Sequence, residues 1–103
     1  MGKSDGCSGG FGGSMHLVDR SVGFEGSTAI VANTIPVALG AAFAENHKQS
    51  ASIVCSFFGE GATEEGVFYE TLNAAALFSV PLLFVCENNG YSVYASETAL
   101  LNL

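Results

Sequence analysis

An acidic and an amide side chain flank one helix and one strand of this sequence, and their types suit a divalent metal beside a phosphate-bearing ligand. Glu60 stands between Gly59 and Gly61, and Asn89 lies in the run Glu87-Asn88-Asn89-Gly90-Tyr91. Carboxylate and amide oxygens are the hard ligands that Mg²⁺ prefers. The glycines beside Glu60 would let phosphate groups approach the backbone. The spacing therefore predicts a magnesium and diphosphate site.

Two apolar runs with a helical pattern between them would position these groups. Residues 52–58, apart from Ser52 and Ser56, and residues 82–86 form apolar runs, which are typical of strands covered on both faces. Residues 63–79 are expected to form a helix that begins with acidic side chains. This order predicts a βαβ unit, hence an α/β fold with a partial parallel sheet and crossover helices. Glu60 and Asn89 would follow neighbouring strand ends, where open α/β sheets bind ligands.

The helix start that follows Glu60 would complete the site. The backbone N–H groups of Gly61 and Ala62 are expected to face the phosphates, because the first N–H groups of a helix are unpaired and attract anions. The backbone carbonyl of Tyr91, close to Asn89, is a candidate third oxygen ligand. Tyr91 and Tyr94 themselves are expected to be half-buried packing groups.

Other interpretations of these segments remain open from the residues alone. A dinucleotide-binding turn would need a third glycine where Glu64 stands. A tight turn from strand to helix would leave Glu60 as a solvated acid. A turn at Asn88-Asn89-Gly90 would use the amides structurally, because Asn-Gly favours left-handed backbone conformations.

A further helix is predicted upstream of these elements. Asn33 or Thr34 can cap it, Pro36 lies near its first position, and the pattern continues to about residue 48. The helix is rich in small residues, which favours close packing. Residues 92–103 show no strong pattern.

The first 28 residues are rich in glycine and are predicted to form an irregular loop. This loop is either a linker or a cover over a ligand. In the second case His16 is a candidate catalytic group, because imidazole transfers protons near neutral pH. We therefore divide the chain into a glycine-rich loop region, 1–28, and a partial α/β domain, 29–103.

The net charge of −7 on 103 residues argues against nucleic acid and anionic membranes as partners, since both are bound through clustered Lys and Arg. No apolar run is long enough to span a bilayer. The three cysteines, Cys7, Cys55 and Cys86, are expected to be free, the last two buried in strands. These features favour the cytoplasm.

The combined pattern resembles the thiamine diphosphate motif. It is similar to the alpha chains of the decarboxylating component of 2-oxo acid dehydrogenase complexes, including pyruvate and acetoin dehydrogenases. The matching residues span most of 9–96 and are Gly12-Gly13-Ser14-Met15-His16, Ile30-Val31, Pro36, Gly59-Glu60-Gly61-Ala62, Glu65-Gly66, Glu70, Leu72-Asn73, Ala75, Pro81, Phe84 and Glu87-Asn88-Asn89-Gly90-Tyr91.

The resemblance implies a thiamine diphosphate-binding fold and two cofactors, thiamine diphosphate and Mg²⁺. Glu60, the Asn89 side chain and the Tyr91 carbonyl would bind the metal. The residues near the cofactor would be Ala29, Val31, Gly59, Gly61, Ala62 and Asn89, with Ala29 and Val31 beside the aminopyrimidine. Glu60 departs from the usual motif, which has Asp there, although branched-chain alpha chains look similar at this point.

The implied activity is oxidative decarboxylation of a small 2-oxo acid, of pyruvate or acetoin type, with acyl transfer to lipoyl groups. The implied partners are a beta chain, in a heterotetramer, and the lipoyl domain of an acyltransferase. Alpha chains of this family are several times longer, so this chain would supply at most half of a site and would be inactive alone. The alternatives are a transketolase-like carbon-carbon lyase or transferase of the same fold and a truncated, non-catalytic remnant.

Overall fold

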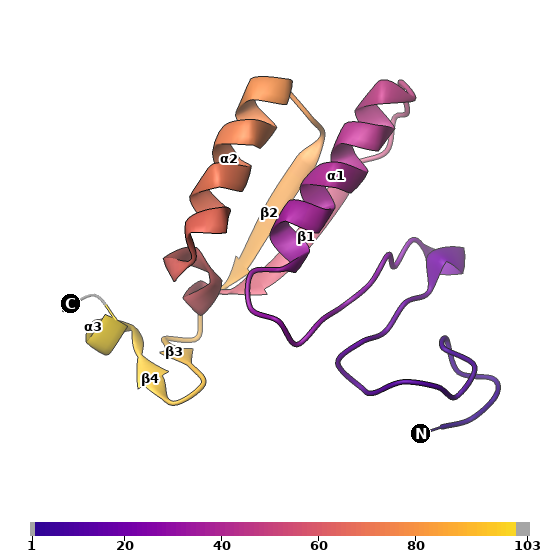
Figure 1. The fold of residues 1–103 in the computed structure, drawn as a ribbon, viewed down its shortest axis with the longest axis horizontal. Coiled ribbons are helices and arrows are strands. Elements are labelled where there is room, and N and C mark those ends of the chain that lie inside the picture. The colour runs from indigo at the N-terminus through magenta and orange to yellow at the C-terminus, as the bar shows by residue number, and fades with distance from the viewer. Residues whose placement is uncertain (1, 101–103) are drawn as a thin grey trace. The chain divides into compact units, whose positions relative to one another are not determined.

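The computed structural model describes residues 2–100, which form two compact units that divide between Ile30 and Val31. The first unit contains the short 3-10 helix η1 (Arg20–Val22). The elements of the second unit are α1 (Thr34–His47), β1 (Val54–Gly59), η2 (Glu60–Glu64), α2 (Gly66–Phe78), β2 (Leu82–Glu87), β3 (Tyr91–Ser92), β4 (Ala95–Ser96) and α3 (Glu97–Leu100) (Figure 1).

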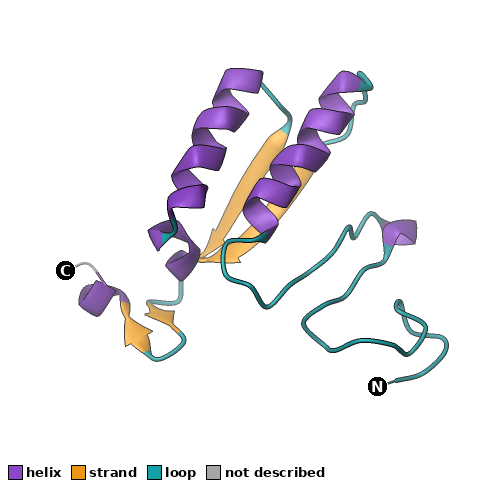
Figure 2. Ribbon diagram, viewed as in Figure 1, coloured by secondary structure: helices purple, strands orange, loops and turns teal. Residues whose placement is uncertain are grey.

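The first unit is mostly loop, as its glycine content predicted (Figure 2). Its one helical turn, η1, begins after Asp19, whose Oδ1 accepts a hydrogen bond from the Ser21 N–H at 3.2 Å. Ser27, beyond this turn, is joined to the stretch before it, because its hydroxyl accepts from the Leu17 N–H and donates to the Met15 carbonyl, both at 3.0 Å. A few side-chain hydrogen bonds therefore shape this loop.

The second unit contains the predicted βαβ arrangement. Strands β1 and β2 pair in parallel, in a register that runs from Val54 opposite Leu82 to Gly59 opposite Glu87. Helix α2 connects them, so the α/β fold class is confirmed. The predicted strands begin and end within two residues of the observed ones, and the register places both carboxyl ends at the same edge.

Helices α1 and α2 lie side by side over one face of these two strands (Figure 1). The core beneath them centres on Ile35, which is fully buried, together with Ala62. Phe58 of β1 packs against Phe68 of α2 with ring centroids 5.6 Å apart, and Phe84 of β2 lies 6.4 Å from both. The aromatic rings thus join both strands to α2.

The opposite face of the strands corrects the expectation of coverage on both faces. Phe57 is 61% exposed and Leu83 52% exposed, and Cys55 and Cys86 are free but exposed rather than buried. Both helices pack on the same side of the sheet, so among the described residues of the second unit no layer covers the other side (Figure 1). Apolar composition alone does not say how many layers a chain contributes.

Helix α1 matches its prediction closely, since it ends at His47 and is followed by Lys48 as its C-cap. Asn33 occupies the N-cap position, but its side chain makes no capping hydrogen bond there. Pro36 is the third residue of the helix rather than the first. Small residues provide the close packing that was expected, with Ala38 and Ala42 buried.

The start of α2 differs from its prediction. The helix begins at Gly66, and the preceding residues form η2 instead. The Thr63 hydroxyl donates to the Glu60 carbonyl at 2.7 Å and closes a tight turn, and Glu65 then adopts an extended conformation. The first turn of α2 therefore carries no acidic side chain.

The segment after β2 also corrects the prediction, because a short antiparallel hairpin forms where no pattern was evident. Strands β3 and β4 pair Tyr91 with Ser96, and the turn places Val93 at a φ of +56°. Tyr91 and Tyr94 are 61% and 96% exposed, not half-buried. A hairpin turn usually carries Asn-Gly or a similar pair, which this one lacks, so the sequence gives little signal. The predicted stretch beyond α3 lies outside the described residues.

The C-cap of α2 offers a stability test. Ser79 adopts a left-handed conformation with φ +50°, and the N–H groups of Ser79 and Val80 donate to the carbonyls of Ala76 and Ala75. Glycine suffers no Cβ clash in this conformation, so Ser79→Gly should stabilise the chain by about 0.5 kcal/mol. Urea unfolding measures the change. Ser79→Ala, which keeps the Cβ, is the control, and an equal gain in both variants would contradict the explanation.

Candidate metal centre

The two predicted ligands meet at the shared edge of β1 and β2. Glu60 directly follows β1, and Asn89 lies just beyond β2. The Asn89 backbone N–H donates to Glu60 Oε2 at 3.5 Å, although the two residues are separated by an entire crossover. The parallel register explains this, because it sets Gly59 opposite Glu87 and so brings the following residues together.

Glu60 is buried, with 9% of its surface exposed, and its Oε1 has no hydrogen-bond partner among the described residues. The interpretation as a solvated acid is therefore wrong. A buried carboxylate oxygen without a donor is costly unless a cation or a proton donor meets it. Glu60 Oε1 is thus a buried carboxylate oxygen at the strand edge that has no hydrogen-bond donor among the described residues. A divalent cation bound to it would offset the cost of burying it.

Asn88 and Asn89 shape the turn that follows β2. The Asn88 side-chain oxygen accepts from the Gly90 N–H at 2.8 Å, and that of Asn89 accepts from the Tyr91 N–H at 2.9 Å. Gly90 has a φ of +80°, as an Asn-Gly turn favours. The amides therefore serve the turn, yet an amide oxygen has two acceptor sites. The bond from the Tyr91 N–H uses one acceptor site of Asn89 Oδ1, so the predicted ligand role of Asn89 is compatible with its role in the turn.

The orientation of the Tyr91 carbonyl follows from the hairpin. The Glu97 N–H donates to the Gly90 carbonyl at 3.0 Å, and Tyr91 pairs with Ser96 at the next position. Hydrogen-bonded and non-hydrogen-bonded pairs alternate along antiparallel strands. The carbonyl of Tyr91 therefore points away from β4. Its N–H points to Asn89, so the backbone of Tyr91 faces the candidate ligand and not its neighbouring strand.

Gly61 and Ala62 follow Glu60, the first residue of η2, and lie in its first turn. In a 3-10 helix the first N–H groups have no partner within the helix, which leaves them for a ligand. A Cβ on Gly61 would meet Ser92 Oγ and would lie 2.8 Å from Ser92 Cβ. Gly59, by contrast, has open space around it. Sequence reasoning missed Ser92, and only the unrecognised hairpin could have indicated it.

The remaining predicted residues lie elsewhere. His16 and Ala29 belong to the first unit and are exposed. Val31 belongs to the second unit and is 58% exposed, directly before the buried Ala32. Within residues 2–100, no three His, Cys, Asp or Glu side chains gather as a metal cluster. A metal at the strand edge would therefore depend on one carboxylate together with amide and carbonyl oxygens.

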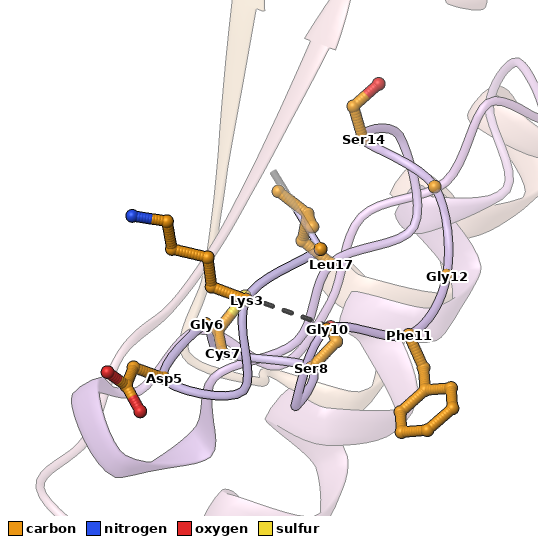
Figure 3. A pocket seen from close by; sticks show the side chains of 12 residues that line it. Lys3, Asp5, Gly6, Cys7, Ser8, Gly10, Phe11, Gly12, Ser14 and Leu17 are labelled. Carbon is orange, nitrogen blue, oxygen red and sulfur yellow. Dashed lines mark hydrogen bonds between the residues drawn. The ribbon is translucent and has the colours of Figure 1, made fainter.

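The first unit has a hollow of about 400 Å³ along its glycine-rich start (Figure 3). Its lining runs from Gly2 to Leu17 and does not include His16. All the lining residues except Ser8 are exposed. Without buried polar groups to orient a ligand, the hollow is a weaker candidate than the strand edge.

A family model described as "Dehydrogenase E1 component" matches residues 1–99. The chain belongs to the dehydrogenase E1 component family. The resemblance inferred from the residue pattern is thereby confirmed, and the Glu60–Asn89 edge is a feature of an E1 chain.

Named relatives of this E1 chain agree with that assignment. It is 42% identical over 97 residues to the mitochondrial pyruvate dehydrogenase E1 component subunit alpha of Solanum tuberosum, covering 94% of this chain and 25% of the relative. It is 44% identical over 96 residues to the pyruvate dehydrogenase E1 component subunit alpha of Rickettsia bellii, covering 93% and 29%. The chain spans about a quarter of the length of these curated relatives.

Proposed function

We propose that this E1 chain is the alpha-side portion of an enzyme that uses thiamine diphosphate and Mg²⁺ to decarboxylate a 2-oxo acid oxidatively. One observation supports this most directly, namely the buried Glu60 carboxylate with an unmet oxygen beside Asn89. The names of the relatives favour pyruvate as the substrate. Reactions of the whole enzyme would need the residues that its longer relatives have in addition.

The donor set at the strand edge fits a magnesium ion. Glu60 Oε1, Asn89 Oδ1 and the Tyr91 carbonyl are hard oxygen ligands from two neighbouring segments, the one that follows β1 and the one that follows β2. Gly59, Gly61 and Ala62 would lie along the diphosphate, where small residues and free N–H groups are needed. When bound, thiamine diphosphate supplies the carbanion stabilisation that decarboxylation requires. The part of this chain is to hold and orient the cofactor's charged end.

The first unit and the partners complete the proposal. His16 would transfer protons near the substrate, and Ala29 and Val31 would contact the aminopyrimidine. A beta chain would complete the site in a heterotetramer, and a lipoyl domain would accept the acyl group. The chain would work in the cytoplasm or, as the name of the Solanum tuberosum relative indicates, in a mitochondrion. In residues 2–100 no helix has the length and apolar character needed to cross a bilayer.

Calorimetric titration tests the proposed function. Thiamine diphosphate with Mg²⁺ is added to the chain, alone and with a beta chain, and compared with Asn89→Ala and Asn88→Ala. Losing a ligand should weaken binding by about tenfold or more in Asn89→Ala, whereas Asn88→Ala should retain it. Equal affinity in all three would contradict the ligand assignment.

Two other outcomes would favour the alternative functions. No binding even with a beta chain would favour a non-catalytic remnant, and turnover of sugar phosphates would favour a transketolase-like enzyme.

A further inference from the structure

We propose that Ser92 is a positioning residue of the metal centre. Its side chain packs on Gly61, docks the β3–β4 hairpin on η2, and so sets the Tyr91 carbonyl relative to Glu60. The metal part of this inference rests on the proposed function. The docking part rests on the structure of the second unit alone.

The contact between Gly61 and Ser92 is tight. A Cβ built on Gly61 would lie 2.8 Å from Ser92 Cβ and 3.8 Å from its Cα, and closest of all to its Oγ. Real Cβ atoms do not approach other atoms as closely as 2.8 Å. A larger residue at position 61 would therefore have to shift its own backbone or displace the Ser92 side chain. The Ser92 side chain thus occupies the space that any other residue at position 61 would need.

Space, rather than backbone conformation, explains the glycine at this position. Gly61 is not among the residues with positive φ, unlike Gly90, so its backbone conformation is open to any residue. Gly66, a few residues along, has no atom within 4 Å of its built Cβ. Of these three glycines, only Gly61 is required by a neighbouring side chain.

The hairpin is held to η2 at two points that bracket Tyr91. On one side, the Asn89 N–H bonds Glu60 Oε2, and Asn89 Oδ1 accepts from the Tyr91 N–H. On the other side, Ser92 rests on Gly61. Because Tyr91 lies between these points, displacing Ser92 from Gly61 would turn the Tyr91 carbonyl relative to the Glu60 carboxylate. Ser92 would then act on the metal through Tyr91, without binding the metal itself.

A double-mutant cycle on the full chain tests this, with Gly61→Ala, Ser92→Gly and the double variant. Two quantities are measured: the affinity for Mn²⁺ alone, by electron paramagnetic resonance, and amide exchange at Tyr91 and Glu97, by NMR. Gly61→Ala should weaken Mn²⁺ binding and speed exchange by about tenfold. The double variant should recover both to within about threefold, because removing the Ser92 side chain vacates the space for the new Cβ. Gly66→Ala is the matched control and should change neither.

The outcomes separate the two proposals. If the double variant stays as impaired as Gly61→Ala, the added Cβ acts on something other than Ser92, and the inference is overturned. If exchange recovers but Mn²⁺ affinity does not, Ser92 docks the hairpin without positioning the metal, which overturns the positioning role. If the unchanged chain, alone and with a beta chain, binds no Mn²⁺, the proposed function fails together with that role, while the exchange cycle still decides the docking contact.

Discussion

Glu60→Gln should remove Mn²⁺ binding at the strand edge while raising the stability of the metal-free chain. Glutamine keeps the shape of the side chain and an oxygen for the Asn89 N–H, but it removes the charge. Loss of an outer-shell partner costs metal sites about 10- to 100-fold in affinity, so loss of the only carboxylate ligand should cost more than about 100-fold. Paramagnetic resonance of added Mn²⁺ measures this.

The stability change has the opposite sign because the carboxylate is buried with one oxygen unmet. Neutralising an uncompensated buried charge relieves a desolvation penalty. Metal-free Glu60→Gln should therefore unfold at a higher urea concentration than the unchanged chain. Added Mn²⁺ should stabilise only the unchanged chain, because only that chain binds it.

Glu64→Gln provides the matched control for this prediction. Glu64 is the last residue of the same 3-10 helix, and its side chain is exposed. This substitution should change neither Mn²⁺ affinity nor stability by a measurable amount. Equal Mn²⁺ affinity in Glu60→Gln and the unchanged chain would remove Glu60 from the ligand set.

The features that could be predicted from the sequence are those set by local patterns with one dominant cause. Two apolar runs around a helical pattern specify a βαβ unit because few other arrangements bury them. The meeting of Glu60 and Asn89 follows from that topology, since parallel strands end at the same edge. The proximity of these two residues was therefore predictable as soon as the strands were.

The features that could not be predicted depend on long-range packing or on weak turn signals. Whether Phe57 is covered depends on layers that the apolar pattern of β1 does not specify. The late start of α2 depends on one bond from the Thr63 hydroxyl to the Glu60 carbonyl, which competes with helix formation. The hairpin turns at Val93, a residue type that avoids positive φ, so its presence contradicts local propensity. The Ser92 contact was hidden for the same reason.

Ile35→Ala should destabilise the second unit by about 3 kcal/mol, the cost of removing buried methyl groups and leaving a cavity. Ile35 is the one large side chain that is fully buried among the described residues. Alanine is the better helix former, so helix propensity in α1 does not contribute to the loss. Urea unfolding followed by circular dichroism measures the change.

Val37→Ala is the control, because Val37 belongs to the same helix but is 63% exposed. It should change stability by less than about 0.5 kcal/mol. A similar loss in both variants would show that helix α1, and not the core beneath it, limits stability.

The cavity left by Ile35→Ala should also affect Mn²⁺ binding at the strand edge. Ile35 packs in one cluster with Ala62, the residue directly after Gly61, so the side chain supports η2 from below. Ile35→Ala should therefore weaken Mn²⁺ binding by a few-fold, far less than Glu60→Gln, because η2 loses support while all its ligands remain. Mn²⁺ should still raise the unfolding midpoint of Ile35→Ala. If it does not, the buried cluster and the metal ligands form a single cooperative element, and the edge of the sheet cannot bind metal without an intact core.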